Sequence, residues 1–198
     1  MSHQLDARRL AKAEKDSEHA RAFRAFSQPW WQDGALSSRD KHIIAVSVAQ
    51  VTQCEYCITH HTLAAKQLGA SQNELLAAAY ITAALNTLAG AEVEIGDDLQ
   101  VRTRPDVLVD RALADARDAF INQQLQNPLL PLTLRVVIAA GVALAQERDA
   151  TRARLHQIAL RHDVDPKALT EAYAVALILR AGAVYAHTLP ILAAFDAP

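Results

Sequence analysis

Two cysteines separated by two residues, and followed closely by two histidines, are the residues of this chain best suited to chemistry. Cys54 and Cys57 are the only cysteines among 198 residues, and His60 and His61 follow them. Thiols one helical turn apart lie close enough to close an intramolecular disulfide. A histidine four residues after the second cysteine falls on the same helical face, within reach of the thiol proton. The segment therefore predicts a redox-active dithiol with its own base.

The positions of the two thiols along a helix predict different roles for them. Cys54 would stand at the helix start, where unpaired backbone N–H groups favour a thiolate. Cys57, one turn further in and beside His61, is the candidate attacking thiol, and Cys54 would resolve the oxidised product into a disulfide. Tyr56 and His60 fall on the flanks of this stripe, so we expect them to line the substrate pocket or to support the catalytic residues.

Two other interpretations of the same residues stay open. Free cysteines also pack well as small hydrophobic side chains. A zinc site could combine both cysteines with one or two histidines, including His42 from the preceding helix. Those ligands would crowd onto one helix, and the sequence has no second CxxC or HxxxH to complete the site. We therefore expect a site without a metal ion.

The composition of the whole chain favours a helical, water-soluble protein. Hydrophobic residues make up 51%, with only 6 glycines and 7 prolines, which favours helices over a turn-rich β architecture. A net charge of −2 gives no general attraction to nucleic acid or to an anionic membrane. Neither a signal peptide nor an apolar run of about 18 residues is evident. We expect a cytoplasmic location, where a close cysteine pair is catalytic or metal-binding rather than structural.

Helical periodicity and capping residues place the dithiol at the start of one helix in a series. A charged helix is predicted from Leu5 to Phe26, with Trp30 and Trp31 in the loop that follows. Ser71 and Glu74 form a capping-box pattern. Further helices are expected at about 40–53, 54–68, 72–88, 107–124, 132–147, 151–161 and 166–194, the last broken near Gly182 or before Pro190.

A weak internal repeat suggests how these helices are organised. The segment Arg135–Ala140 resembles His42–Ser47 at an offset of roughly 93–94 residues. We therefore predict a single all-α domain over 1–198, built from two related helical halves packed together. Residues 22–90 would form the half with the CxxC pair, 91–106 a connector, and 107–198 a cysteine-free half that serves packing.

The stretch from about Phe23 to Gly90 resembles the AhpD-like / carboxymuconolactone decarboxylase-like family. The likeness rests on the CxxCxxxH pattern from Cys54 to His61, the apolar helix before it and Gly69-Ala70-Ser71 after it. It implies an AhpD-like helical bundle that forms homo-oligomers and has alkylhydroperoxidase-like or disulfide-reductase activity. In such members the second cysteine, here Cys57, is activated by the histidine through a proton relay.

Two departures from the AhpD pattern concern this relay. A glutamate stands twelve residues before the first cysteine in well-understood members, whereas this chain has His42 there. A histidine can shuttle protons near neutral pH, so a relay through His42 is expected, with a different charge state. The histidine before the second cysteine of AhpD is Tyr56 here. These differences indicate a relative of AhpD with a different substrate.

The sequence thus predicts an enzyme, an alkylhydroperoxidase-like thiol oxidoreductase with peroxiredoxin-type activity. Its catalytic residues would be Cys54, Cys57, His61 and His42. Its partners would be a small-molecule hydroperoxide or a partner's disulfide, and an external thiol reductant, with no other cofactor, no nucleic acid and no membrane. The alternatives are a non-redox decarboxylase or lactone-processing enzyme of the same fold, and a zinc-binding module.

Overall fold

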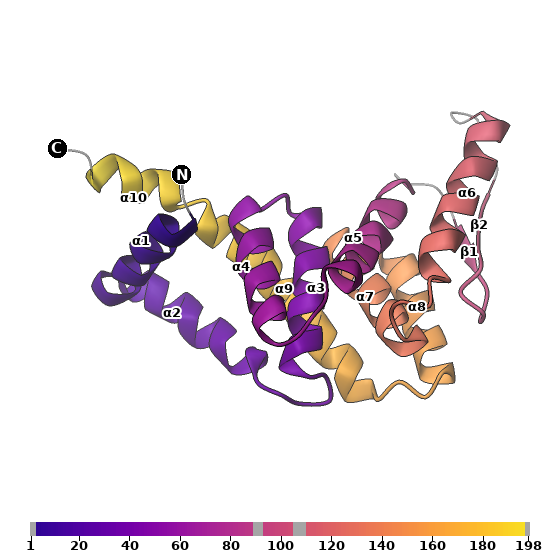
Figure 1. The fold of residues 1–198 in the computed structure, drawn as a ribbon, viewed down its shortest axis with the longest axis horizontal. Coiled ribbons are helices and arrows are strands. Elements are labelled where there is room, and N and C mark those ends of the chain that lie inside the picture. The colour runs from indigo at the N-terminus through magenta and orange to yellow at the C-terminus, as the bar shows by residue number, and fades with distance from the viewer. Residues whose placement is uncertain (1–2, 89–92, 105–109, 197–198) are drawn as a thin grey trace.

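The computed structural model describes residues 3–88, 93–104 and 110–196, which are almost entirely helical (Figure 1). The helices are α1 (His3–Asp16), α2 (Glu18–Ser27), the 3₁₀ helix η1 (Gln28–Trp31), α3 (Ser38–Val51), α4 (Glu55–Gln67), α5 (Gln72–Asn86), α6 (Arg111–Leu125), α7 (Leu132–Ala145), α8 (Asp149–Arg161), α9 (Pro166–Ala186) and α10 (Leu189–Asp196). This arrangement confirms the predicted all-α bundle. A small antiparallel hairpin of β1 (Val93–Ile95) and β2 (Val101–Thr103) accompanies the helices.

The centre of the bundle is formed by α3 and α7. Residues Leu134–Ala143 of α7 and Ile43–Ala49 of α3 are all buried. A helix buried on every side has no polar stripe, and α3 accordingly shows a continuous apolar run from Ile43 to Val46. The long helix α9 packs against both central helices, while α4 and α5 cover α3, and α8 covers α7. The apolar runs of the sequence therefore became the core.

The N-terminal region departs from the single helix predicted from Leu5 to Phe26. The structure has two helices that meet at Ser17, and the Ser17 hydroxyl accepts a hydrogen bond from the backbone N–H of Ala20 at 3.5 Å. Serine competes poorly in a helix interior but satisfies a free N–H at a helix start. The break lets α1 and α2 form a V at one end of the molecule, as Figure 1 shows.

The C-terminal segment breaks before Pro190, one of the two predicted positions, and stays helical through Gly182. Its last helix, α10, packs on α1, where Asp196 pairs with Arg9 at 3.1 Å. By length and composition alone, the segment Pro166–Asp196 passes a test for a membrane-crossing helix, with a mean hydropathy of 1.6, but a helix of a protein core passes the same test. The inner face of α9 belongs to the core of the bundle.

Two three-helix units, α3–α5 and α7–α9, have matching bounds. Helices α3 and α7 differ by 94 residues at both ends, as do α4 and α8, and α5 and α9 begin 94 residues apart. The turns match too, because Gln53 and Glu147 both have left-handed backbones, with φ of 54° and 59°. The predicted boundaries of the two halves stay a prediction. Of the predicted connector 91–106, the hairpin occupies 93–103, and residues 91–92 and 105–106 lie outside the described residues.

Candidate active site

The two cysteines form a disulfide at the start of α4, with their Cα atoms 5.2 Å apart. Cys54 is the N-cap of this helix, and its sulfur accepts a hydrogen bond from the backbone N–H of Cys57 at 3.2 Å. The turn from α3 holds it there, because the N–H of Cys54 donates to the carbonyl of Ala49 at 3.1 Å. The positive end of a helix favours a thiolate at this position.

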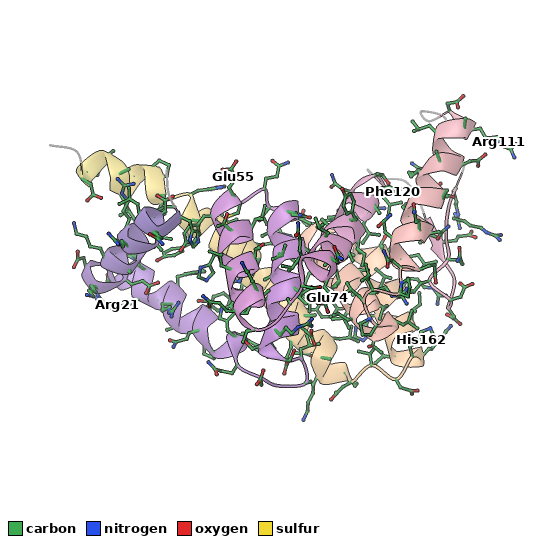
Figure 2. All side chains as sticks on the ribbon, viewed as in Figure 1. Arg21, Glu55, Glu74, Arg111, Phe120 and His162 are labelled. Atoms are coloured by element: carbon green, nitrogen blue, oxygen red, sulfur yellow. A yellow bond between two sulfur atoms is a disulfide. The ribbon has the colours of Figure 1, made fainter. Side chains whose placement is uncertain are left out.

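The two sulfurs differ in accessibility. Cys54 is fully buried, with 0% of its surface exposed, whereas Cys57 is 5% exposed and lines a pocket. A molecule that enters the pocket therefore meets Cys57. Glu55, which lies between Cys54 and Tyr56 in the sequence, points outward into solvent (Figure 2) and does not line the pocket.

A hydrogen-bonded pair of histidines lies beside the disulfide. The Nδ1 atoms of His42 on α3 and His61 on α4 are 2.8 Å apart, so one ring donates and the other accepts. Burial, with the charge of nearby His60 as the second cause, lowers the pKa of His42 to about 4. Burial also lowers the pKa of His61 well below its ordinary value, with His60 and His42 adding to the effect. The pair is therefore uncharged at neutral pH and can accept a proton.

The indole ring of Trp31 covers this histidine pair. Its centroid lies 4.9 Å from that of His42, with the two rings only 5° from parallel, and 4.7 Å from the ring of His61. Trp31 belongs to η1, which contains Pro29 in its first turn, so the predicted loop at Trp30 and Trp31 is a short helix. The indole replaces water over the pair, which is consistent with burial being the main cause of the lowered pKa values.

Tyr56 and His60 line the pocket on the flanks of the dithiol, where the sequence predicted them. His60 packs edge-on against His61 at 5.0 Å and stacks on Tyr56 at 5.8 Å. Desolvation lowers the pKa of His60, and the positive charges of His3 and Arg24 lower it further. Burial raises the pKa of Tyr56, assisted first by the carboxylate of Glu14. The phenol therefore stays protonated near neutral pH and can act as a hydrogen-bond donor.

The pocket itself is a cavity of about 310 Å³ between α1, α2, α4 and α9. Its apolar walls include Leu10, Phe23, Ile178 and Leu179. This volume is at the lower end of the roughly 300–1,000 Å³ of small-molecule sites. The site can hold a compact organic molecule against Cys57.

Several residues of the pocket could not be found by sequence reasoning. Tyr185 on α9 stacks on Phe23 of α2 with ring centroids 4.4 Å apart, and its hydroxyl donates to Glu14 of α1 at 3.4 Å. Burial, with the Glu14 carboxylate second, raises the pKa of Tyr185 to about 12. These residues come from three helices with no shared motif, and α9 is far from α1 and α2 in the sequence, so only the packing of the helices identifies them.

The zinc alternative gains no support from the geometry. Over 3–88, 93–104 and 110–196, no group of three or more His, Cys, Asp or Glu side chains is placed to hold a metal ion. Both candidate cysteine ligands are also joined to each other. A structural zinc site requires about four ligands in a tetrahedral arrangement, and the two histidines instead bond to one another.

Comparison with known proteins identifies the part of the chain that holds this site. Residues 17–94 match the profile of the carboxymuconolactone decarboxylase family. The matched segment is similar to this family and makes up less than half of the chain. It contains both cysteines and His42, His60 and His61, whereas α1 and α9, which complete the pocket, lie outside it.

One curated relative matches part of the chain. "Uncharacterized protein 4 in cox locus" from Paracoccus denitrificans is 44% identical over 62 residues, which make up 31% of this chain and 56% of the relative. The chain thus spans about half the length of that relative. No solved structure gives a significant match to the chain.

Proposed function

We propose that the protein is an alkylhydroperoxidase-like thiol oxidoreductase, in which Cys57 attacks the substrate and Cys54 forms the disulfide. The observation that supports this most directly is a Cys54–Cys57 disulfide at the wall of a pocket, beside a hydrogen-bonded histidine pair. The family of residues 17–94 is compatible with such an AhpD-like enzyme.

In the first step, His61 accepts the proton of the Cys57 thiol. If His61 carries its own proton on Nδ1, it can pass this proton to Nδ1 of His42 while its Nε2 accepts the proton of the thiol. Both rings are neutral at pH 7 because their pKa values are lowered, so the pair can accept this proton. The start of α4 stabilises the thiolate that results.

In the second step, the Cys57 thiolate attacks the terminal oxygen of a hydroperoxide, ROOH. The O–O bond breaks, Cys57 becomes a sulfenic acid, and the alkoxide leaves as the alcohol with the proton returned by the histidine pair. The Cys54 thiol then attacks the sulfenic sulfur, forming the disulfide and releasing water. The sulfur is oxidised by two electrons and the peroxide is reduced to an alcohol and water.

An external thiol must restore the dithiol, and it must attack at Cys57. Cys54 is fully buried, so the reductant meets the Cys57 sulfur in the pocket. Its thiolate forms a mixed disulfide with Cys57 and expels Cys54, whose thiolate is stabilised by the helix start. A second thiol then releases the oxidised reductant. The same exchange in reverse would reduce the disulfide of a partner, which is the other half of the proposal.

The family match also supports a second candidate, a non-redox decarboxylase or lactone-processing enzyme. In that enzyme the histidine pair would perform acid–base chemistry on a pocket-bound substrate, and the cysteines would only pack. The two candidates differ in whether activity requires the thiols.

Free-thiol titration with intact mass, before and after one equivalent of cumene hydroperoxide, tests the proposal. The reduced protein should lose both thiols and two hydrogen atoms without gaining oxygen, while cumyl alcohol forms in equal amount. Cys54→Ser should instead gain one oxygen, as a sulfenic acid trapped by dimedone. Thiols that stay reduced in the wild-type protein would reject the redox function and favour the decarboxylase candidate.

A further inference from the structure

Glu171, on α9, holds the loop that follows Trp31. Its carboxylate accepts hydrogen bonds from the backbone N–H groups of Ala35 at 3.0 Å and Leu36 at 2.9 Å. Glu171 lies outside the family segment 17–94, does not line the pocket and was not among the predicted site residues. Its contacts nevertheless reach the elements that carry the histidine pair.

The buried side chain of Lys41 completes this fastening. Its ammonium group lies 3.0 Å from the Glu171 carboxylate and donates to the backbone carbonyl of Gln32 at 2.6 Å. Gln32 is the next residue after Trp31, and Lys41 directly precedes His42 in α3. The ion pair therefore ties both ends of the loop 32–36 to the helix that carries His42.

The loop packs closely against the carboxylate at Gly34. A Cβ atom added to Gly34 would overlap the Glu171 carboxylate oxygen Oε1. Burial alone would raise the pKa of Glu171, but hydrogen bonds from Leu36, Lys41 and Ala35 outweigh it and leave this pKa below its ordinary value. The carboxylate is thus ionised at neutral pH and remains a strong acceptor for all three donors.

We propose that Glu171 is a positioning residue, which holds Trp31 against the His42–His61 pair through the loop 32–36 and Lys41. The parallel stacking of Trp31 on His42 depends on where η1 ends, and η1 ends at the residue before Gln32. Any effect of Glu171 on turnover rests on the proposed function, because it would act through the same histidine pair. The structural consequence, a change in how water reaches the pair, does not require any turnover.

Loss of this fastening should rehydrate the histidine pair. The other titratable groups near the pair are His60 on α4, with Glu14 on α1, Arg24 on α2, and Tyr56 and Tyr185 around the pocket. None of them contacts Glu171, so its replacement leaves their charges in place. The expected change is a rise of the histidine pKa values toward the ordinary value of about 6.5.

The test follows the ring C–H signals of His42 and His61 by NMR as a function of pH in the oxidised protein. Glu171→Gln should move the midpoint of at least one of them upward by about half a pH unit or more. The control is Glu147→Gln, which removes an ion pair with Arg180 of the same helix, away from the pocket. It should leave both midpoints unchanged.

Gly34→Ala is the second variant, in case Glu171→Gln folds poorly. It keeps both charges but forces the carboxylate and the loop apart, and it should shift the same midpoint in the same direction. Unchanged midpoints in either folded variant would overturn the positioning role. Shifted midpoints without any peroxide consumption by the wild-type protein would support the positioning role while rejecting the proposed function.

Discussion

The units α3–α5 and α7–α9 share their helix bounds and turns but differ at the residues that could do chemistry. At an offset of 94 residues, each cysteine and histidine of the first unit has a different counterpart. Cys54, Cys57, His61 and His42 correspond to Arg148, Thr151, Leu155 and Val136. The three-helix arrangement therefore does not depend on the dithiol or on the histidine pair.

The exchange of His61 for Leu155 indicates what the first unit gives up for its chemistry. Leu155 is fully buried, as expected for a core position, and His61 is nearly as buried, with 8% exposed. Burying an imidazole ring lowers its pKa, whereas a leucine there contributes apolar packing.

At the position just before His42, by contrast, the two units have similar residues. Lys41 and its counterpart Arg135 are both buried cations that donate to carbonyls of the preceding loop.

The surroundings of the two units also differ. His60 of α4 faces the pocket under α1 and α2. Its counterpart on α8, Arg154, instead donates to the carbonyl of Ile95 at 2.6 Å and pairs with Asp97 at 2.8 Å in the β1–β2 hairpin. The same helical face is thus left open for a ligand in one unit and covered by the hairpin in the other. The chemistry requires both the residues and the opening.

The largest expected effect separates the two units at a single position. Cys57→Ser should abolish hydroperoxide consumption, because no thiolate would then face the pocket. Thr151→Ser, at the matching position of the second unit, should leave the rate unchanged. Consumption of cumene hydroperoxide in the presence of dithiothreitol measures both. A Cys57→Ser variant with the wild-type rate would remove Cys57 from the role of nucleophile.

His61→Leu gives the first unit the residue of the second. Loss of a general base typically slows a reaction by about 10²- to 10⁴-fold, and we expect a decrease of this order in hydroperoxide consumption. Alkylation of Cys57 by iodoacetamide across pH should show a higher thiol pKa in the variant. An alkylation profile identical to that of the wild-type protein would show that His61 is not the base.

The reverse experiment moves the CxxC pair from the first unit to the second. Arg148→Cys combined with Thr151→Cys, in a background of Cys54→Ser and Cys57→Ser, places a CxxC pair at the start of α8. Because α8 begins as α4 does, the new thiols should form a disulfide on mild oxidation by diamide. They should not consume hydroperoxide above the rate of a free thiol, since Leu155 and Val136 cannot move a proton. Wild-type turnover by this variant would show that the pair alone is sufficient.

The smallest expected effect concerns stability against pH. The pKa of His42 is lowered to about 4 in the folded protein, so between pH 6.5 and 4 the unfolded chain binds a proton that the folded chain does not. The free energy of unfolding should therefore fall as the pH drops through this window, by at most about 1.4 kcal/mol per pH unit for each histidine. Urea unfolding at a series of pH values measures it.

Substituting the residue of the second unit provides the control for that prediction. His42→Val should reduce the pH dependence of stability between pH 6.5 and 4, whereas His19→Gln, on α2, should not, because the side chain of His19 is exposed to solvent. A pH dependence that persists undiminished in His42→Val would show that other groups cause it.

The sequence by itself determined the local features of the site. The spacing of Cys54 and Cys57 at a helix start, the capping box of Ser71 and Glu74, and the left-handed Gly69 that ends α4, with φ of 89°, depend on residues within one or two turns. Local hydrogen bonds and backbone preferences decide such features. The same reasoning failed at Ser17, because a serine inside a charged helix and a serine between two helices look alike in sequence.

Only the tertiary structure decided how these local features combine into a site. The position of His42 was singled out by resemblance, but its hydrogen bond to His61, the cover of Trp31, the pocket of Phe23 and Tyr185 and the support from Glu171 join α1, α2, α3, α4 and α9. Such contacts follow from how the buried faces of α3 and α9 pack, and helix packing depends on the shape of whole surfaces rather than on residue spacing. The chemistry of the dithiol is therefore local, whereas its environment is a property of the bundle.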